Sequence, residues 1–183
     1  MFIKRKLAAV AWLGMTLGMT VAAGGSTIAT SPVRYEKWVN YRFGIHFDLP
    51  SGMTPGMEPA NGDGRDFKTS DGAVVVTVSG ENNAMFRTVK QQMTFSLSFA
   101  PKPVVVTYRR VTKTWYVCSG YSGGKIFYEK AIYHDQQFDT IGIVYPKKDV
   151  ARFNPIAARI AGSMRYKEVP PVNGEYLAGT DRE

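Results

Sequence analysis

Alternating apolar and polar residues, the pattern of a half-buried β-strand, recur through most of the chain. Ile45, Phe47 and Leu49 fall on one face of a short strand. Asp71-Gly72 is a dipeptide typical of a tight hairpin turn. On this basis we expect strands at residues 41–43, 45–49, 65–69, 73–79, 104–111, 114–121, 125–134 and 138–145, with a turn or bulge at Gly44.

Two segments have the spacing of an amphipathic helix instead. The first begins at Asn82 or Asn83 and extends to about Ser96; its apolar face would consist of Met85, Val89 and Met93, with Phe86 beside them. The second begins at Ala151 or Asn154, with Asn154 as the N-cap and Pro155 in the first turn. Its buried stripe would consist of Ile156, Ile160 and Met164.

The order of these elements predicts an α+β fold with a single antiparallel sheet of about six to seven strands, flanked by two helices. The last four strands are separated by short turns, which indicates an antiparallel meander. Residues 50–64 contain three prolines and four glycines and are expected to form a long irregular loop. A chain of 183 residues suits one such domain.

The N-terminal residues have the layout of a secretory signal peptide. Lys4, Arg5 and Lys6 precede an uncharged, mostly apolar stretch, and small residues favour cleavage after Ala23. An uncleaved membrane anchor is the alternative. We therefore expect a signal peptide at residues 1–23, a linker at 24–37, the domain at 38–167 and a disordered tail at 168–183, in a periplasmic or secreted protein.

The charge of the exported chain narrows the choice of partners. Without the three basic residues of the signal peptide, 20 Lys and Arg residues remain against 15 acidic residues, and the formal net charge falls from +8 to +5. Mild basicity suits an acidic protein, lipid headgroups or a cell-wall polymer. Nucleic acid is not expected, because the chain is exported and lacks a basic run. A single cysteine, Cys118, cannot form an internal disulfide.

Several strand and turn sequences resemble those of small exported proteobacterial proteins of unassigned function. These sequences are Tyr41-Arg42-Phe43-Gly44-Ile45, Gly62-Asp63-Gly64-Arg65, Val106-Thr107-Tyr108, Trp115-Tyr116-Val117-Cys118-Ser119-Gly120 and Lys125-Ile126-Phe127-Tyr128. From about residue 41 to residue 166, the element order also resembles the PsbP-like α/β/α sandwich. That resemblance implies an accessory or assembly factor that binds other proteins, and it supplies no catalytic residue.

The sequence contains only weak signals for a catalytic or metal site. Asp63 and Asp66 could offer oxygen ligands to Ca²⁺, but their spacing does not match an EF-hand loop, and a structural turn is favoured. Cys118 and His134 could form a nucleophile and base only if the fold brought them together, and a buried, inert thiol is the expected state of Cys118. We predict no catalytic residue, no metal site and no cofactor.

The best candidate binding surface is a basic, aromatic group on neighbouring strands, formed by Arg109, Arg110, Lys113, Trp115 and Tyr116. Solvated strand ends beside core aromatics are the alternative interpretation. We expect a periplasmic, non-enzymatic binding or accessory domain with a protein partner. Two other functions remain open: a hydrolase or cell-wall enzyme that uses Cys118 or the acids around Asp63, and a domain that binds anionic lipid or polysaccharide. The oligomeric state is left open.

Overall fold

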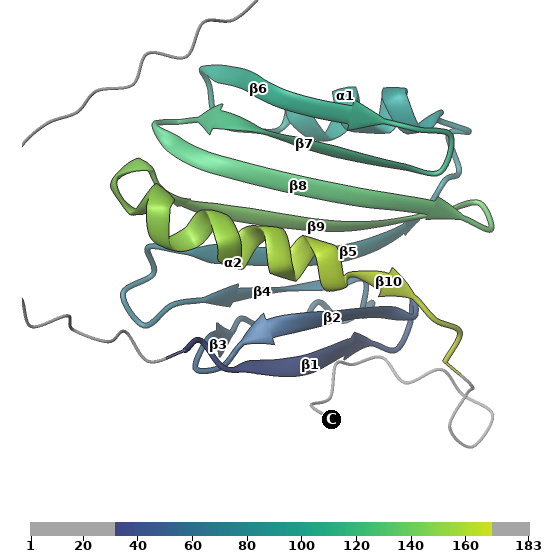
Figure 1. The fold of residues 1–183 in the computed structure, drawn as a ribbon. Coiled ribbons are helices and arrows are strands. Elements are labelled where there is room, and N and C mark those ends of the chain that lie inside the picture. Colours follow the sequence, from purple (N-terminus) through teal and green to yellow (C-terminus); the bar gives the residue numbers. More distant parts are fainter. Residues whose placement is uncertain (1–31, 170–183) are drawn as a thin grey trace, which may run out of the picture. The chain divides into compact units, whose positions relative to one another are not determined.

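The computed structural model describes residues 32–169, which form three layers (Figure 1). The central layer is an antiparallel sheet of seven strands in the order β3-β4-β5-β9-β8-β7-β6. These strands are β3 (Thr54–Pro55), β4 (Gly64–Lys68), β5 (Val75–Asn82), β6 (Val104–Val111), β7 (Trp115–Ser122), β8 (Lys125–His134) and β9 (Gln137–Pro146).

One outer layer combines a helix with a small second sheet. Helix α2 (Val150–Ser163) follows the short 3₁₀ turn η1 (Lys147–Asp149) and crosses the sheet over its middle strands (Figure 1). Beside it lie β1 (Tyr35–Asn40), β2 (Ile45–Pro50) and β10 (Arg165–Tyr166), paired in the order β1-β2-β10. This layer leaves β6, β7 and part of β8 uncovered on the same side of the large sheet (Figure 1).

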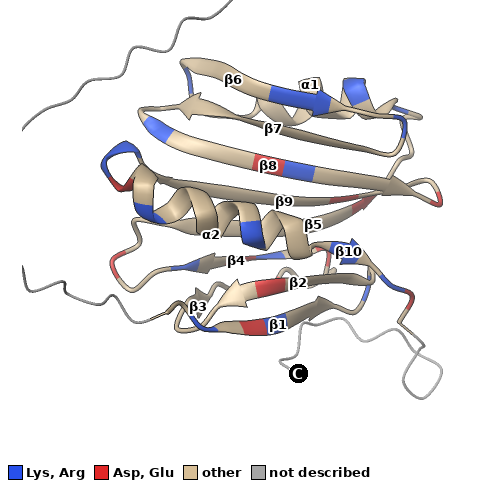
Figure 2. Ribbon diagram, viewed as in Figure 1, with Lys and Arg blue, Asp and Glu red and all other residues tan. Residues whose placement is uncertain are grey.

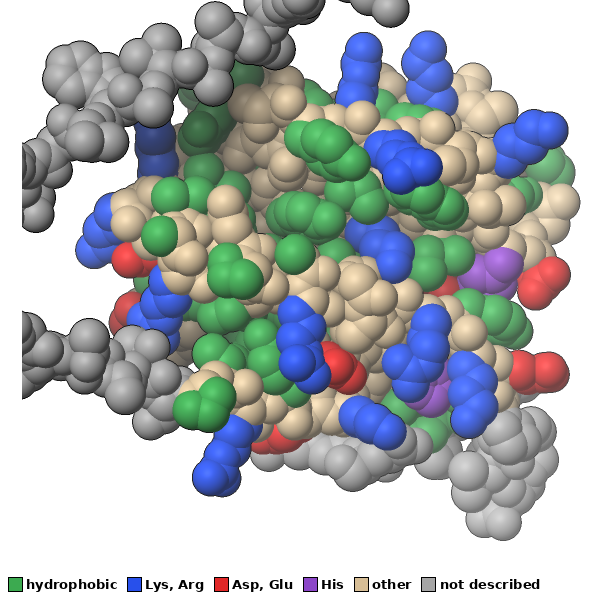
Figure 3. All heavy atoms as spheres, in the orientation of Figure 1, with side chains coloured by type: hydrophobic (Ala, Val, Ile, Leu, Met, Phe, Trp, Pro, Cys, Tyr) green, Lys and Arg blue, Asp and Glu red, His purple; other side chains and the backbone are tan. Residues whose placement is uncertain are grey.

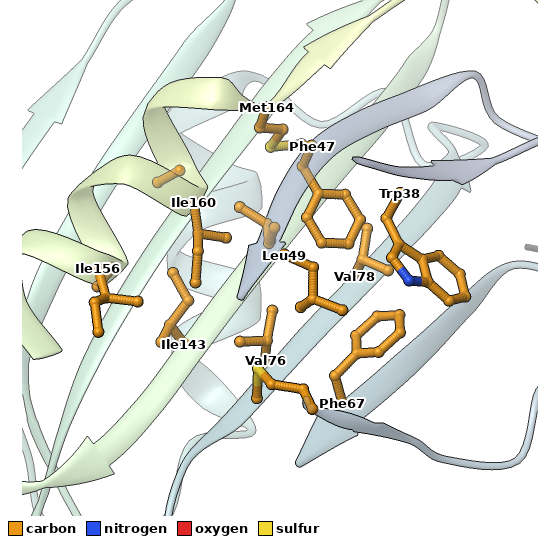
Figure 4. Close-up of a cluster of buried hydrophobic side chains, with 14 of the residues drawn as sticks. Trp38, Phe47, Leu49, Phe67, Val76, Val78, Ile143, Ile156, Ile160 and Met164 are labelled. Atoms are coloured by element: carbon orange, nitrogen blue, oxygen red, sulfur yellow. The ribbon is translucent and has the colours of Figure 1, made fainter. Parts of the chain in front are cut away.

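The larger hydrophobic core fills the space between these two layers (Figure 4). Phe67 of β4 contacts the small sheet within this core, with its ring centroid 4.5 Å from that of Trp38 and 6.0 Å from that of Phe47. Ile156 and Ile160 of α2 are buried in this core, as their helical spacing predicted. Apolar burial here holds the small sheet and α2 against the large one.

Helix α1 (Val89–Ser98) covers the opposite face of the large sheet. Thr88 caps its N-terminus in a capping box with Gln91. Val89 and Met93 face the sheet and are buried, as predicted. The second core consists of Val89, Met93, Tyr116, Cys118, Phe127, Ala131 and Phe138.

The predicted α+β fold with one large antiparallel sheet and two helices is confirmed, but the N-terminal strands were placed wrongly. Residues 41–43 form the turn of the β1–β2 hairpin, and β1 begins at Tyr35, within the segment expected to be a linker. Phe43 lies in this turn and not in a strand. Its ring packs over Gly80 of β5, where any Cβ would collide with it. The small sheet was not predicted.

The start of α1 differs from the prediction, and the start of α2 agrees to within one residue with the earlier of its two predicted positions, Ala151. Helix α1 begins six or seven residues later than expected, because Asn83 uses its side chain to hold a loop instead of capping a helix. Helix α2 begins at Val150 and contains Pro155. Asn154 lies inside the helix and is not its N-cap; its side-chain oxygen accepts a hydrogen bond from the Tyr145 hydroxyl at 2.6 Å. Pro155 is the sixth residue of α2, beyond the first turn, so its ring nitrogen leaves the Ala151 carbonyl without the usual intrahelical donor.

The predicted signal peptide at residues 1–23 lies outside the described residues, as does the C-terminal segment from residue 170 onward. Among residues 32–169, no helix combines the length and the apolar character that crossing a membrane requires.

Candidate binding surfaces

One long segment of the sequence carries charge of a single sign. Residues 82–128 contain seven basic residues and no acidic residue. The fold gathers this segment into α1, β6, β7, the first residues of β8 and their connecting loops, toward one edge of the large sheet (Figure 2). The basic residues are Arg87, Lys90, Lys102, Arg109, Arg110, Lys113 and Lys125. Neither the total charge nor short clusters of basic residues reveals this segment; the signal is the long interval between Glu81 and Glu129 without an acidic residue.

Part of this edge presents aromatic side chains on the side of α2. Residues directly opposite each other in an antiparallel pair share a face, and Lys130 of β8 reaches α2, which defines that face. Val117 opposes both Lys130 and Arg110, so Arg110 lies on the same side. We call this surface the β6–β8 face; it consists of Tyr108, Arg110, Trp115, Val117, Tyr121 and Tyr128.

The β6–β8 face is open to solvent. Tyr108 is 51% exposed and Tyr121 is 37% exposed. The Arg110 guanidinium lies 5.3 Å from the Trp115 ring centroid, within the range of a cation–π contact. Figure 3 shows hydrophobic side chains with basic ones among them over these strands. An exposed set of this kind marks an interaction surface more often than a free one.

Two hollows lie along α2 where it borders β7 and β8. The first, of about 350 Å³, has Trp115, Ile132 and Ala158 among its lining residues. The second, of about 300 Å³, is lined in part by Tyr121 and Asn154. Tyr128 lines both, so the two hollows follow one another along the helix. A partner side chain that contacts the β6–β8 face would therefore find recesses beside it.

The structure separates the five predicted binding residues. Arg110 and Trp115 meet on the β6–β8 face, whereas Arg109 opposes Cys118 and therefore lies on the α1 side. Lys113 lies in the turn between β6 and β7. Tyr116 is fully buried and does not belong to a surface. Single-residue alternation along β6 and β7 explains the split, because neighbours in sequence point to opposite faces of a sheet.

On the α1 side, a rigid loop precedes the helix and carries two exposed apolar residues. The Asn83 side chain donates to the Arg87 carbonyl at 2.9 Å and accepts from the Arg87 amide at 2.8 Å. Between these two residues, Met85 is 74% exposed and Phe86 is 80% exposed. Phe86 has a φ of 51°, which a residue with a Cβ rarely adopts. We call the two hydrogen bonds between Asn83 and Arg87 the Asn83 clamp. They hold Phe86 outward in a strained backbone conformation.

Replacing Phe86 with glycine is expected to stabilise the domain. Glycine removes the Cβ strain, which outweighs its larger loss of backbone entropy, and the net gain is about 0.5–1 kcal/mol. Urea unfolding followed by circular dichroism measures this difference. Phe86→Ala keeps the strain while removing the ring, so it is the matched control and should show no comparable gain.

The residues considered for catalysis do not form a site. Cys118 is buried on the α1 side, and burial together with Glu129 raises the pKa of its thiol to about 12. His134 lies on the opposite face of the sheet, where its ring stacks on Tyr166 with centroids 3.7 Å apart. A thiol in this state is a poor nucleophile at neutral pH. The structure therefore excludes a Cys118–His134 pair.

His134 has a structural set of contacts instead. Its Nε2 lies 2.8 Å from Asp139 Oδ2, and Gln137 donates both to Asp139 Oδ1 at 2.5 Å and to the Phe43 carbonyl at 3.1 Å. Burial raises the pKa of Asp139, while the hydrogen bond from His134 opposes that shift. These contacts tie the β8–β9 hairpin to the β1–β2 turn.

The acids considered for Ca²⁺ binding have local partners within the described residues. Asp63 accepts a hydrogen bond from Asn61 at 2.7 Å, and Asp66 accepts one from the Thr77 hydroxyl at 2.7 Å. Arg65, between them, pairs with Glu58 at 2.8 Å. Among residues 32–169, no three His, Cys, Asp or Glu side chains converge as a metal site would require.

The three-layer arrangement is a PsbP-like fold. Its likeness to a solved protein is clear in the solution structure of cyanobacterial PsbP (CyanoP) from Synechocystis sp. PCC 6803, with a TM-score of 0.56 and 10% sequence identity. The match covers 82% of this chain and 99% of that chain. No protein-family profile matches the chain, and no curated protein sequence matches it. At this identity the likeness shows the fold alone.

Proposed function

We propose that this chain is an exported, non-enzymatic accessory domain that binds a protein partner through the β6–β8 face. The observation that carries the proposal is a surface group in which the exposed side chains of Tyr108 and Arg110 lie with the half-buried Trp115, outside the part of the sheet that α2 covers. Tyrosine, tryptophan and arginine are the residues that dominate protein–protein binding energy. A periplasmic location remains a proposal that rests on the predicted signal peptide.

The charge of the segment indicates what the partner's surface should contain. Arg110 has no acidic neighbour in sequence between residues 82 and 128, and the adjoining basic residues add to its field. An acidic patch on the partner would be attracted to this edge, and a basic one would be repelled. We therefore propose a partner whose contact surface combines carboxylates with apolar side chains that fit the hollows along α2.

A crosslinking experiment in intact cells tests this proposal. A photoreactive phenylalanine analogue replaces Tyr108, and a matched variant carries it at Met57, which is 94% exposed on another part of the domain. We expect one protein to be crosslinked at position 108 and absent at position 57. The same proteins captured from both positions, or none from either, would contradict the proposed surface.

Substitution of Trp115 quantifies the contact once that protein is purified. Truncating a central aromatic residue costs about 2 kcal/mol of binding free energy, so Trp115→Ala should weaken the affinity about thirtyfold by calorimetry. Arg110→Glu should weaken it further, and a charge-reversing substitution on the partner should restore part of the loss. Met57→Ala is the control and should leave the affinity unchanged. Equal affinities for all variants would place the binding site elsewhere.

A further inference from the structure

The α1 side of the domain carries a second exposed apolar surface, separate from the β6–β8 face. We call it the α1 patch, and it consists of Met85, Phe86, Phe95 and Phe99. Phe99 is 73% exposed and Phe95 is 40% exposed, in addition to the strongly exposed pair Met85 and Phe86 in the preceding loop. Four large apolar side chains in water on one loop and helix are unusual for a surface without a partner.

The α1 patch is held in place by contacts from its own layer. The Phe95 and Phe99 rings meet edge to face, with centroids 4.9 Å apart. The Arg87 guanidinium lies 4.1 Å from the Phe95 ring centroid and pairs with Glu81 at 2.9 Å. Arg87 is also the residue that Asn83 clamps, so the exposed loop and the aromatic side of α1 form one connected unit.

Basic side chains surround the α1 patch. A pocket of about 530 Å³ has Phe86, Lys90 and Lys113 among its lining residues, together with the polar side chains of Thr88 and Thr112. Neither lysine takes part in an ion pair with any described residue. Arg109, at the exposed end of β6, lies on the same side of the sheet. The pocket thus places two unpaired cations beside a projecting aromatic ring.

We propose that the α1 patch seats the domain on an anionic lipid bilayer. Phe86 and Met85 would enter the boundary between headgroups and acyl chains, and Lys90 and Lys113 would contact headgroup phosphates beside them. Exposed apolar side chains beside unpaired lysines match a bilayer interface, where acyl chains and anionic headgroups lie next to each other. No acidic residue occurs between positions 82 and 128; the acids nearest the loop are Glu81, which pairs with Arg87, and Asp135, next to Gln136 in the pocket lining.

This placement is compatible with the proposed protein partner but independent of it. The α1 patch and the β6–β8 face lie on opposite sides of the large sheet. A domain held at a bilayer by the α1 patch would therefore keep the β6–β8 face directed away from the lipid. Failure of one surface in an experiment leaves the other testable, because the two share no side chain.

Vesicle sedimentation tests the proposal with residues 24–183, which omit the predicted signal peptide and its own affinity for lipid. Both hydrophobic cores are built from residues between Trp38 and Met164, so this chain retains the whole described domain. The probes are vesicles of phosphatidylcholine alone and vesicles in which about one third of the lipid is phosphatidylglycerol. We expect binding to the anionic vesicles that weakens with added salt, because salt screens exposed charges.

Substitutions in the loop distinguish insertion from general attraction. Met85→Ser with Phe86→Ser should reduce the partition coefficient on anionic vesicles more than tenfold, because two apolar side chains no longer enter the bilayer. Met57→Ser is the matched control and should change it little. Phe86→Trp adds a fluorophore whose emission should shift to the blue on binding, and acyl-chain quenchers should reduce it.

Charge reversal tests the lysines in the same way. Each basic side chain near an anionic surface contributes about fivefold to binding, so Lys90→Glu with Lys113→Glu should weaken it at least twenty-fivefold. Lys37→Glu with Lys68→Glu, at exposed positions of β1 and β4, changes the net charge by the same amount and should have a clearly smaller effect. Equal weakening by this control pair would show attraction by net charge alone and overturn the proposal. Binding that the loop variant leaves unchanged, or self-association that Phe86→Ser abolishes, would also overturn it.

Discussion

Phe67→Ala is expected to lower the free energy of unfolding by about 3–5 kcal/mol, the range for removing a fully buried phenylalanine. Phe67 is 0% exposed and contacts two aromatic rings of the small sheet, Trp38 and Phe47. Its loss leaves a cavity between the small and large sheets. Chemical unfolding followed by tryptophan fluorescence measures the effect, because Trp38 reports directly on this junction.

A milder substitution at the same place separates packing from general damage. Phe67→Leu keeps most of the apolar volume and should cost less than half as much as Phe67→Ala. Met57→Ala, at a position that is 94% exposed, should lie within about 0.5 kcal/mol of the original protein. A cost below about 1 kcal/mol for Phe67→Ala would mean that the small sheet is not held by this cluster.

The strands with an unbroken alternating pattern were predictable from the sequence, and those that depend on distant contacts were not. The bounds predicted for β6 and β8 match the structure, because each is a continuous run flanked by turn residues. Strand β10 has only two residues and exists because it pairs with Ile45 and His46 of β2. Two residues carry no periodicity, so a local pattern cannot reveal such a strand.

The candidate site was predictable only in part, for a related reason. Basic and aromatic residues at positions 109–116 correctly indicated a charged, aromatic edge of the sheet. Their assignment to one patch was wrong for Tyr116, which is buried, and for Arg109, which lies on the other side of β6. The helical spacing predicts Phe86 beside a helix face, whereas the structure places it in an exposed loop at a positive φ, between the two hydrogen-bonded residues Asn83 and Arg87. The apolar spacing that begins at Met85 cannot show that helix α1 starts only at Val89.

The layer formed by α1 is joined to the large sheet through a buried carboxyl group. Glu129 of β8 accepts hydrogen bonds from the Tyr116 hydroxyl at 2.6 Å and from the Ser96 hydroxyl of α1 at 2.7 Å. Burial raises the pKa of Glu129, and the two hydrogen bonds only partly oppose that shift. Cys118, directly opposite on β7, stays a neutral thiol, because burial and the Glu129 carboxyl raise its pKa to about 12. Glu129 thus links α1 to the sheet, but its ionised form is destabilised by burial.

The sign of the pH dependence follows from this raised pKa. Between the ordinary pKa of a glutamate and the raised value, the folded protein keeps a proton on Glu129 that the unfolded chain has released. Folding stability therefore falls as the pH rises through that window. Burial raises the pKa of Asp139 in the same direction, so the slope of the original protein contains both groups.

Glu129→Gln isolates the contribution of Glu129. A glutamine can accept from Tyr116 and donate to the Ser96 oxygen, so both contacts survive without the ionisable proton. We expect this variant to match the original protein in acid and to exceed its stability at neutral pH. Glu129→Ala, by contrast, leaves the buried Tyr116 hydroxyl without an acceptor and adds a cavity, which should cost about 3–5 kcal/mol in acid and less at neutral pH, where the original protein has itself lost stability through Glu129. Chemical unfolding across this pH range measures both, and a Glu129→Gln curve parallel to that of the original protein would show that Glu129 does not titrate there.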